Sequence, residues 1–186
     1  MNWKELLILP FVVPHIIAYL FSSRKKTIIA DLGRWQTIKK RYVDPNRPIG
    51  SILKLLIRRK DFRTQFYLRI GGISPILRFF LRPAACDIEN DVFDDGLLMI
   101  HAIGIVINGH AKVGKNCTIY HGVTIGVGNN IKKAPQIGDN VFIGAGAKII
   151  GNIKIGNNVK IGAGAIVVTD IPDGVTVISP KAKILL

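Results

Sequence analysis

The sequence predicts a parallel β-helix that follows a basic helical region. Two observations carry this prediction: an aliphatic residue returns every six positions from Ile107 onward, and a glycine often follows it. A period of six fits neither the turn of an α-helix nor the alternation of a β-strand. Each hexapeptide is therefore expected to form one side of a three-sided coil, with its aliphatic residue pointing inward.

The predicted coil has an irregular start, one interruption and a defined end. It is expected to begin at Asp87, to become regular at Ile107 and to stop at Ile171–Pro172, with closing strands between Val175 and Leu186. The break at residues 126–135 is expected to leave the coil as a loop and to supply a wall for a site, because a coil has no cleft of its own. The aliphatic positions are Ile107, Val113, Ile119, Ile125, Ile137, Ile143, Ile149, Ile155, Ile161 and Val167. Glycine follows at 114, 126, 138, 144, 156 and 162, where it relieves crowding or permits a positive φ.

Charge divides the chain into residues 1–85, a basic helical region, and residues 86–186, the coil. The chain has a formal net charge of +14, and its first 86 residues hold 17 Lys and Arg against 4 Asp and Glu. Arginines 58, 59 and 63 alternate with aromatic residues, yet no nucleic-acid recognition motif is visible, so we expect a solvated or membrane-facing helical surface. Two cysteines make no disulfide framework; Cys117 is expected in the core, and Cys86 is expected to be a buried structural thiol rather than a reactive one.

The segment Leu6–Phe21 is almost wholly apolar and precedes a basic cluster, Arg24–Lys26. It contains two prolines and is shorter than the roughly 20 residues that a transmembrane helix needs. No signal-peptide cleavage pattern follows it. Two interpretations stay open for residues 1–26: an interfacial helix on the inner leaflet, with the basic cluster at anionic headgroups, or a helix buried between subunits.

The rest of the helical region is divided by turn signals. Asp31 is expected to cap a short helix, and Ser51 is expected to N-cap an amphipathic stretch that runs to Gly71. Asp44–Pro48 is expected to form a turn-rich connection between them. A further short helix is expected from Ser74–Pro75 to Leu81.

His101 is the foremost candidate for chemistry. It follows an acid-rich segment, and an imidazole oriented by a carboxylate can take a proton from a hydroxyl near neutral pH. His121 is a second candidate, about one coil later and beside the loop. A structural role is the ordinary alternative for any single histidine. The acids of that segment are Asp87, Glu89, Asp91, Asp94 and Asp95.

Three stretches resemble the serine acetyltransferase family of the hexapeptide-repeat acyltransferase superfamily: His101–Val106, Ile119–Gly126 and Ile137–Asn152. The ending from Ile161 is similar to it as well, so the resemblance covers residues 86–186. It implies a left-handed β-helix, a homotrimer with active sites between neighbouring coils, and acetyl-CoA as acetyl donor. Whether trimers pair into hexamers stays open.

The resemblance also implies roles for single residues. His101 matches the catalytic base and Asp87 its carboxylate partner, although the interval between them is one residue shorter here, which leaves Glu89 as the alternative. The cofactor-binding positions are Gly126, Gly144, Ala145, Gly162 and Ala163. No metal is expected, because no cluster of Cys and His ligands is present.

Departures from the family bear on the acceptor, whose pocket is expected to include His121 and Lys133. Ile100 stands where serine-specific members carry an aspartate, and Lys133–Ala134 stands where they carry Arg-His. A site without those polar groups should bind free serine poorly. The helical leader resembles that of capsule and exopolysaccharide acetyltransferases through Asp31–Trp35, Asp61–Arg63 and Phe66–Ile70.

These departures favour an O-acetyltransferase that modifies a sugar hydroxyl, such as a lipid-linked saccharide, during bacterial surface polysaccharide synthesis. Its expected location is the bacterial cytoplasm at the inner face of the cytoplasmic membrane. A serine O-acetyltransferase and a non-catalytic trimeric scaffold are the alternatives.

Overall fold

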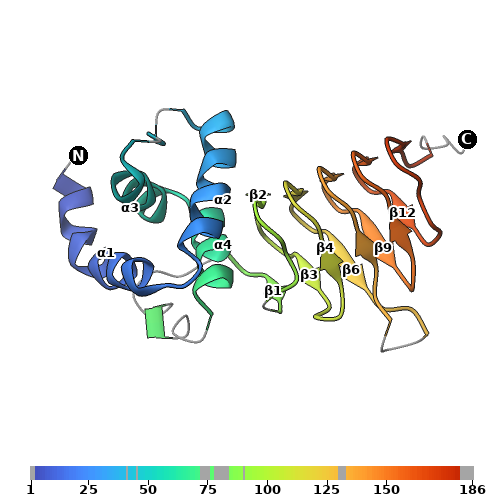
Figure 1. The fold of residues 1–186 in the computed structure, drawn as a ribbon, viewed down its shortest axis with the longest axis horizontal. Coiled ribbons are helices and arrows are strands. Elements are labelled where there is room, and N and C mark those ends of the chain that lie inside the picture. The colour runs from blue at the N-terminus through green and yellow to red at the C-terminus, as the bar shows by residue number, and fades with distance from the viewer. Residues whose placement is uncertain are drawn as a thin grey trace, which may run out of the picture.

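A computed structural model describes residues 3–40, 42–44, 46–71, 76–77, 84–89, 91–129 and 133–180, and side chains from residue 7 onward. Helices occupy the N-terminal part and short parallel strands stack along one axis behind them (Figure 1). The strands of highest residue number lie at the end of the stack farthest from the helices (Figure 1). The protein is therefore a parallel β-helix with an N-terminal helical region, as the sequence predicts, and it has the left-handed form that the family resemblance implies.

The described strands form three faces of the coil, and each face is a parallel sheet. Registers of 18 residues, such as Ile143 with Ile161 and Ile107 with Ile125, join successive turns. Face A holds β1 (Asp87–Ile88), β3 (Val106–Ile107), β6 (Thr124–Gly126), β9 (Lys148–Ile150) and β12 (Ile166–Val167). Face B holds β4 (Lys112–Val113), β7 (Gln136–Ile137) and β10 (Lys154–Ile155). Face C holds β2 (Leu98–Ile100), β5 (Thr118–Tyr120), β8 (Phe142–Ile143), β11 (Lys160–Ile161) and β13 (Thr176–Val177).

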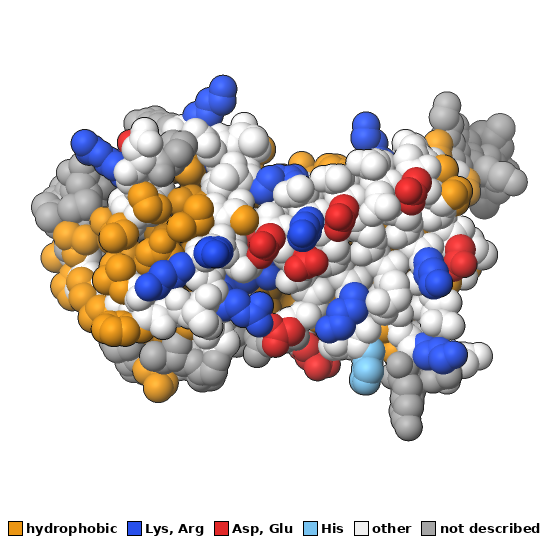
Figure 2. Space-filling view, viewed as in Figure 1, with side chains coloured by type: hydrophobic (Ala, Val, Ile, Leu, Met, Phe, Trp, Pro, Cys, Tyr) orange, Lys and Arg blue, Asp and Glu red, His pale blue; other side chains and the backbone are white. Residues whose placement is uncertain are grey.

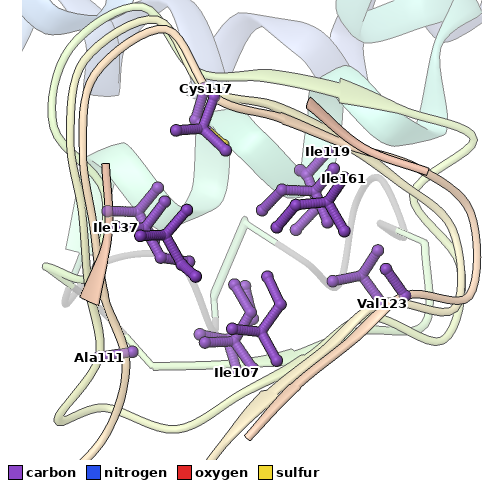
Figure 3. Packing of buried hydrophobic residues seen from close by; sticks show 14 of the residues in the cluster. Ile107, Ala111, Cys117, Ile119, Val123, Ile137 and Ile161 are labelled. Carbon is purple, nitrogen blue, oxygen red and sulfur yellow. The ribbon is translucent and has the colours of Figure 1, made fainter. Parts of the chain in front are cut away.

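The periodic aliphatic residues fill the interior of the coil, as the sequence predicts. Ile107, Ile119, Ile137 and Ile161 point into the triangular interior, and Cys117 lies at a corner of it (Figure 3). Burial raises the pKa of the Cys117 thiol to about 12 and also raises that of Cys86, which is half-buried beside the core. The expected structural role fits both thiols, because a raised pKa leaves little nucleophilic thiolate.

The glycines that follow the aliphatic residues relieve crowding and do not supply positive φ. A Cβ at Gly144 would lie 2.6 Å from the Ala163 nitrogen, and one at Gly138 would lie 2.9 Å from the Gly156 carbonyl carbon. Positive φ occurs instead at the corners, at residues such as Asn116, Asn140 and Gly146.

The helical region consists of α1 (Trp3–Phe21), α2 (Lys25–Ile38), α3 (Pro48–Arg58) and α4 (Lys60–Ile70). Two predicted caps are wrong. Asp31 lies inside α2 and is buried, and Ser51 lies inside α3, where its hydroxyl accepts the Asp44 N–H at 2.8 Å. The stretch from Ser51 to Gly71 is not one helix, because an extended Arg59 separates α3 from α4. Most of the helix predicted over Ser74–Leu81 lies outside the described residues.

α1 has one buried and one exposed apolar face. Val12, His15 and Tyr19 are buried in the helical core. Desolvation lowers the pKa of His15 to about 4, so this imidazole is neutral at physiological pH. The exposed face carries Leu7, Phe11, Val13, Ile17, Leu20 and Phe21. Among the helices that the structure describes, none joins enough length to enough apolarity for a membrane crossing.

A buried ion pair joins the helical region to the first turn of the coil. The Arg69 guanidinium donates to the Asp31 carboxylate at 2.9 and 3.1 Å, and to the carbonyls of Phe93 and Asp94 at 2.7 and 2.6 Å. Asp31 also accepts the Leu97 N–H at 2.8 Å. Burial raises the pKa of the Asp31 carboxyl, and the Arg69 guanidinium opposes that rise. The pair therefore bonds backbone groups at the open end of the coil.

Replacement of Arg69 by Met is expected to lower the free energy of unfolding by about 3–5 kcal/mol, because it leaves the Asp31 carboxylate buried without its cation. Urea denaturation followed by circular dichroism measures the change. Arg24→Met is the matched control: Arg24 pairs with Asp91 on the surface, where both side chains are about half exposed or more, so its loss should cost less than about 1 kcal/mol. Equal losses in the two variants would contradict the structural role of the buried pair.

Candidate active site

The two candidate histidines lie on one corner of the coil, between faces C and A. We call this corner the histidine edge; it comprises His101–Gly104, His121–Gly122, Gly144–Gly146 and Gly162–Gly164. Backbone hydrogen bonds of 2.8–2.9 Å run along it from Gly122 N to Ile103 O, from Gly146 N to His121 O and from Gly164 N to Ala145 O. His121, Ala145 and Ala163 therefore occupy the same position in successive turns.

His101 lies on a bulge of this edge. Partners in adjacent turns are 20 residues apart before the corner, at Ile100 and Tyr120, but 18 apart after it, at Val106 and Thr124. The first turn thus holds two extra residues there. Ala102 is buried in the coil core, whereas His101 is exposed and has a φ of 51°, a left-handed conformation that non-glycine residues seldom adopt. The bulge directs the imidazole outward, away from the core.

The rings of His101 and His121 lie side by side in adjacent turns. Their centroids are 6.4 Å apart and their planes meet at 71°. Lys148 adds a positive charge near this pair, because its ammonium donates to the Gly122 carbonyl and the Thr124 hydroxyl, both at 3.0 Å. The edge therefore combines two exposed imidazoles with one cation and the small residues that follow.

An open groove of about 380 Å³ lies in front of His101. The helical region forms one wall through the junction of α3 and α4, and the bulge forms the other. A groove of this volume suits a small acceptor. The described residues that line it are Arg58, Arg59, Lys60, Asp61, Ala84, Ala85, His101, Ala102 and Ile103.

The structure does not join Asp87 to His101. Asp87 is exposed on β1, at the register of Val106, and no hydrogen bond or ion pair links it to His101 in the part of the chain that the structure describes. Glu89, the alternative, accepts the Gly109 N–H at 3.2 Å near the corner between faces A and B. Asp61 is the carboxylate that shares the groove with His101, and it is held by Arg59.

The other predicted residues divide between two edges. Gly144, Ala145, Gly162 and Ala163 lie on the histidine edge. Gly126 ends β6 at the other side of face A, where the loop leaves the coil (Figure 1). Lys133 is exposed at the loop's return, and Ala134 is buried in the coil core. Within one chain, Gly126 and Lys133 are thus separated from His101 by the width of face A.

Sequence reasoning missed the basic side of the groove and the position of Lys148. The sequence predicts a solvated or membrane-facing helical surface for Arg58 and Arg59, and Asp61 enters only through a motif that resembles polysaccharide acetyltransferases. No local pattern shows that the α3–α4 junction lies opposite His101, because this contact joins segments about forty residues apart in the chain.

Residues 134–169 match the family model of the bacterial transferase hexapeptide (six repeats). Within the coil, residues 134–169 therefore carry a repeat of the kind found in bacterial hexapeptide transferases. A curated serine acetyltransferase of Staphylococcus aureus (strain Mu50) is 43% identical over 98 residues, which cover 50% of this chain and 43% of the relative. The chain therefore spans less than half the length of the curated relative.

Two solved structures are similar to this protein beyond the coil. Serine acetyltransferase from Brucella abortus strain S19 in complex with coenzyme A has a TM-score of 0.64 and 26% identity, and the match covers 86% of this chain and 66% of that one. Neisseria gonorrhoeae serine acetyltransferase in complex with serine has a TM-score of 0.59 and 29% identity over 86% and 68% of the two chains. The similarity includes part of the helical region, since the coil makes up little more than half of this chain.

Gly144→Ala is expected to lower the free energy of unfolding by about 1–3 kcal/mol, a usual cost of overpacking, because the new methyl group would meet backbone atoms of the next turn. Gly126→Ala is the matched variant, since its methyl group would meet only side-chain atoms, the end of Ile150 at 3.3 Å and the methyl group of Thr124 at 3.9 Å. Thermal unfolding compares the two. Equal stability of both variants would show that the turn spacing can relax at Gly144.

Proposed function

We propose that this protein is an O-acetyltransferase that moves an acetyl group from acetyl-CoA to a hydroxyl, with His101 as the general base. The observation that carries the proposal is the histidine edge, which aligns an exposed imidazole with His121, Ala145 and Ala163 in successive turns. Similarity to serine acetyltransferases, one of them in complex with coenzyme A, supports the donor.

In the proposed reaction the acceptor oxygen attacks the thioester carbonyl carbon while His101 takes the hydroxyl proton. The tetrahedral intermediate then expels the thiolate of coenzyme A as the C–S bond breaks, and the imidazolium returns the proton to the sulfur. Backbone N–H groups near the edge would stabilise the oxyanion, and the general base would supply about 10²–10⁴-fold of the rate.

A carboxylate is needed to hold the imidazolium in this scheme. Asp87 keeps that proposed role, because its side chain is exposed on the strand beside the corner and hydrogen bonds of catalytic groups often tighten only when substrate binds. Asp61 is the carboxylate that lines the groove, but its pairing with Arg59 reduces its negative potential at His101.

Serine is the acceptor that the named relatives support. The sugar acceptor that the sequence analysis favoured has no support from these relatives, which are serine acetyltransferases. One observation keeps it as the second candidate: Ile100 packs against the helical core and Ala134 is buried in the coil core, so neither contributes a polar contact to a small zwitterion. The location in a surface-polysaccharide pathway rests on this second candidate alone.

The proposed assembly is a homotrimer. Gly126 and Lys133 lie on a different edge from His101, so a site that unites them needs the loop of a neighbouring copy beside the histidine edge. The three-sided cross-section of this coil would allow copies to pack side by side around a threefold axis.

His101→Ala is expected to lower kcat for acetyl transfer by about 10²–10⁴-fold with an unchanged thermal unfolding midpoint, because the ring is exposed and its loss leaves no cavity. Release of the coenzyme A thiol, followed with a thiol reagent, measures the rate with L-serine and with oligosaccharide acceptors. His121→Ala is the control for the edge.

Wild-type activity in the His101→Ala variant, together with its loss in His121→Ala, would move the base to residue 121. Turnover of L-serine above that of oligosaccharides would end the sugar candidate, and the reverse result would end the serine candidate. Absence of turnover by the wild type with any acceptor would support the scaffold alternative.

We also propose that the exposed face of α1 lies in the headgroup region of an anionic membrane leaflet. Hydrophobic side chains gather over the helical region, and Lys and Arg side chains border them (Figure 2). Every exposed side chain that the structure describes on α1 is apolar, and Lys25 and Lys26 begin α2 after a three-residue connection. Such a face beside basic residues is typical of interfacial helices. We prefer the membrane to burial between subunits because the basic residues that border this face would contact anionic headgroups.

Flotation with vesicles tests the membrane proposal. The wild type is expected to float with phosphatidylglycerol-containing vesicles, and Phe11→Asp/Ile17→Asp should bind at least about tenfold more weakly, since each buried apolar side chain contributes about 1.5–3 kcal/mol. Ile166→Asp, an exposed isoleucine on the coil, should float like the wild type. No flotation of the wild type, with a smaller oligomer in the double variant, would instead support burial between copies.

A further inference from the structure

The groove in front of His101 has an excess of positive charge. Arg59 and Asp61 form an ion pair within it, so their charges offset each other. Arg58 and Lys60 line the same groove and are both exposed. The described lining therefore holds three basic side chains against one carboxylate, a formal excess of two positive charges.

The local structure holds these charges at the rim. The Arg58 guanidinium lies over the Tyr42 ring, 5.0 Å from its centroid, which limits the rotamers of a long side chain. Arg59 lies over the Trp35 ring at 5.4 Å, so the pair with Asp61 is packed against the helical core. α4 begins at Lys60, and the positive end of its dipole adds to the potential at the groove.

We infer that this groove binds an anionic group of the acceptor, a carboxylate or a phosphate carried near the hydroxyl that is acetylated, and that Arg58 and Lys60 determine this specificity. The inference rests on the proposed function and names the acceptor class. The two acceptor candidates can share this chemistry, because serine has a carboxylate and activated sugars carry phosphate. Arg58 suits a planar or tetrahedral oxyanion, and Lys60 supplies a mobile point charge.

The two walls of the groove supply different chemical groups. The coil wall supplies His101 and the bulge, and the helical wall supplies the cations. An acceptor that spans the groove would meet the base at one end and the cations at the other. An acceptor without charge would keep the base but lose the second contact, so the charged group should affect KM more than kcat.

Initial rates with matched acceptors test the inference. The acceptors are L-serine against serinol, which lacks the carboxylate, and a hexose 1-phosphate against the methyl hexoside. Arg58→Gln/Lys60→Gln is expected to raise KM about tenfold or more for the charged acceptor, because a hydrogen bond to an ion contributes more than a neutral one. The values of kcat, of KM for acetyl-CoA and of KM for the neutral acceptor should stay near those of the wild type.

Lys54→Gln is the matched control, since Lys54 is exposed on α3 but does not line the groove. It removes the same charge from the same helix and should leave KM for every acceptor unchanged. A rise of KM in the double variant for L-serine would identify a carboxylate as the bound group, and a rise for the hexose 1-phosphate would identify a phosphate. An equal rise of KM for charged and neutral acceptors, or no rise for either charged one, would overturn the inference.

A binding measurement separates this inference from the proposed function. If the wild type turns over none of these acceptors, titration with inorganic phosphate is followed through the His101 imidazole resonances. A saturable shift that the double variant loses and Lys54→Gln retains would support the anion site even though the proposed reaction had failed. Absence of any shift in the wild type would refute the site.

Discussion

The arrangement of the whole molecule depends on the buried pair of Asp31 and Arg69. The first turn of a β-helix exposes backbone N–H and C=O groups that have no earlier turn to bond, and such an edge invites pairing with another chain. Here the pair bonds Phe93, Asp94 and Leu97, and Gln65 donates to the Leu97 carbonyl at 2.8 Å. The helical region is therefore a polar cap as well as a second core.

This cap also positions the groove. Arg69 lies in the last turn of α4 and Lys60 begins the helix, so the contact that fixes its C-terminal end also fixes the end that faces His101. Trp35 strengthens the frame by donating to Gln65 at 3.1 Å and packing edge-on against Phe62. The position of Lys60 at the groove therefore depends on the contacts of Arg69 at the other end of α4.

The coil could be predicted from the sequence because its period is local and repeated. Ile107, Ile119 and Ile161 each face the same environment, so a single rule places them. The helical region obeys no such rule. Asp31 has the residue type of a helix cap, and only its contact with Arg69, far along the chain, shows that it is buried inside α2.

The site could also be predicted only where its residues belong to the repeat. His121, Ala145 and Ala163 follow from the repeat, since each occupies an equivalent corner. The relation of Asp87 to His101 does not follow, because the bulge breaks the regular spacing of the corner that holds His101. The basic wall of the groove could not be predicted from the sequence. It depends on the placement of the helical region against the coil, and the two regions have different sequence periods.

The bulge at His101 has a consequence for how such proteins diverge. Registers on both sides of the corner are intact, so the two extra residues leave the neighbouring strands and the core undisturbed. A corner of this coil can thus accept inserted residues while the faces between corners keep their shape. The side chains at a corner can therefore change without a change in the strands. The same coil can then present different reactive groups at the same position along its axis.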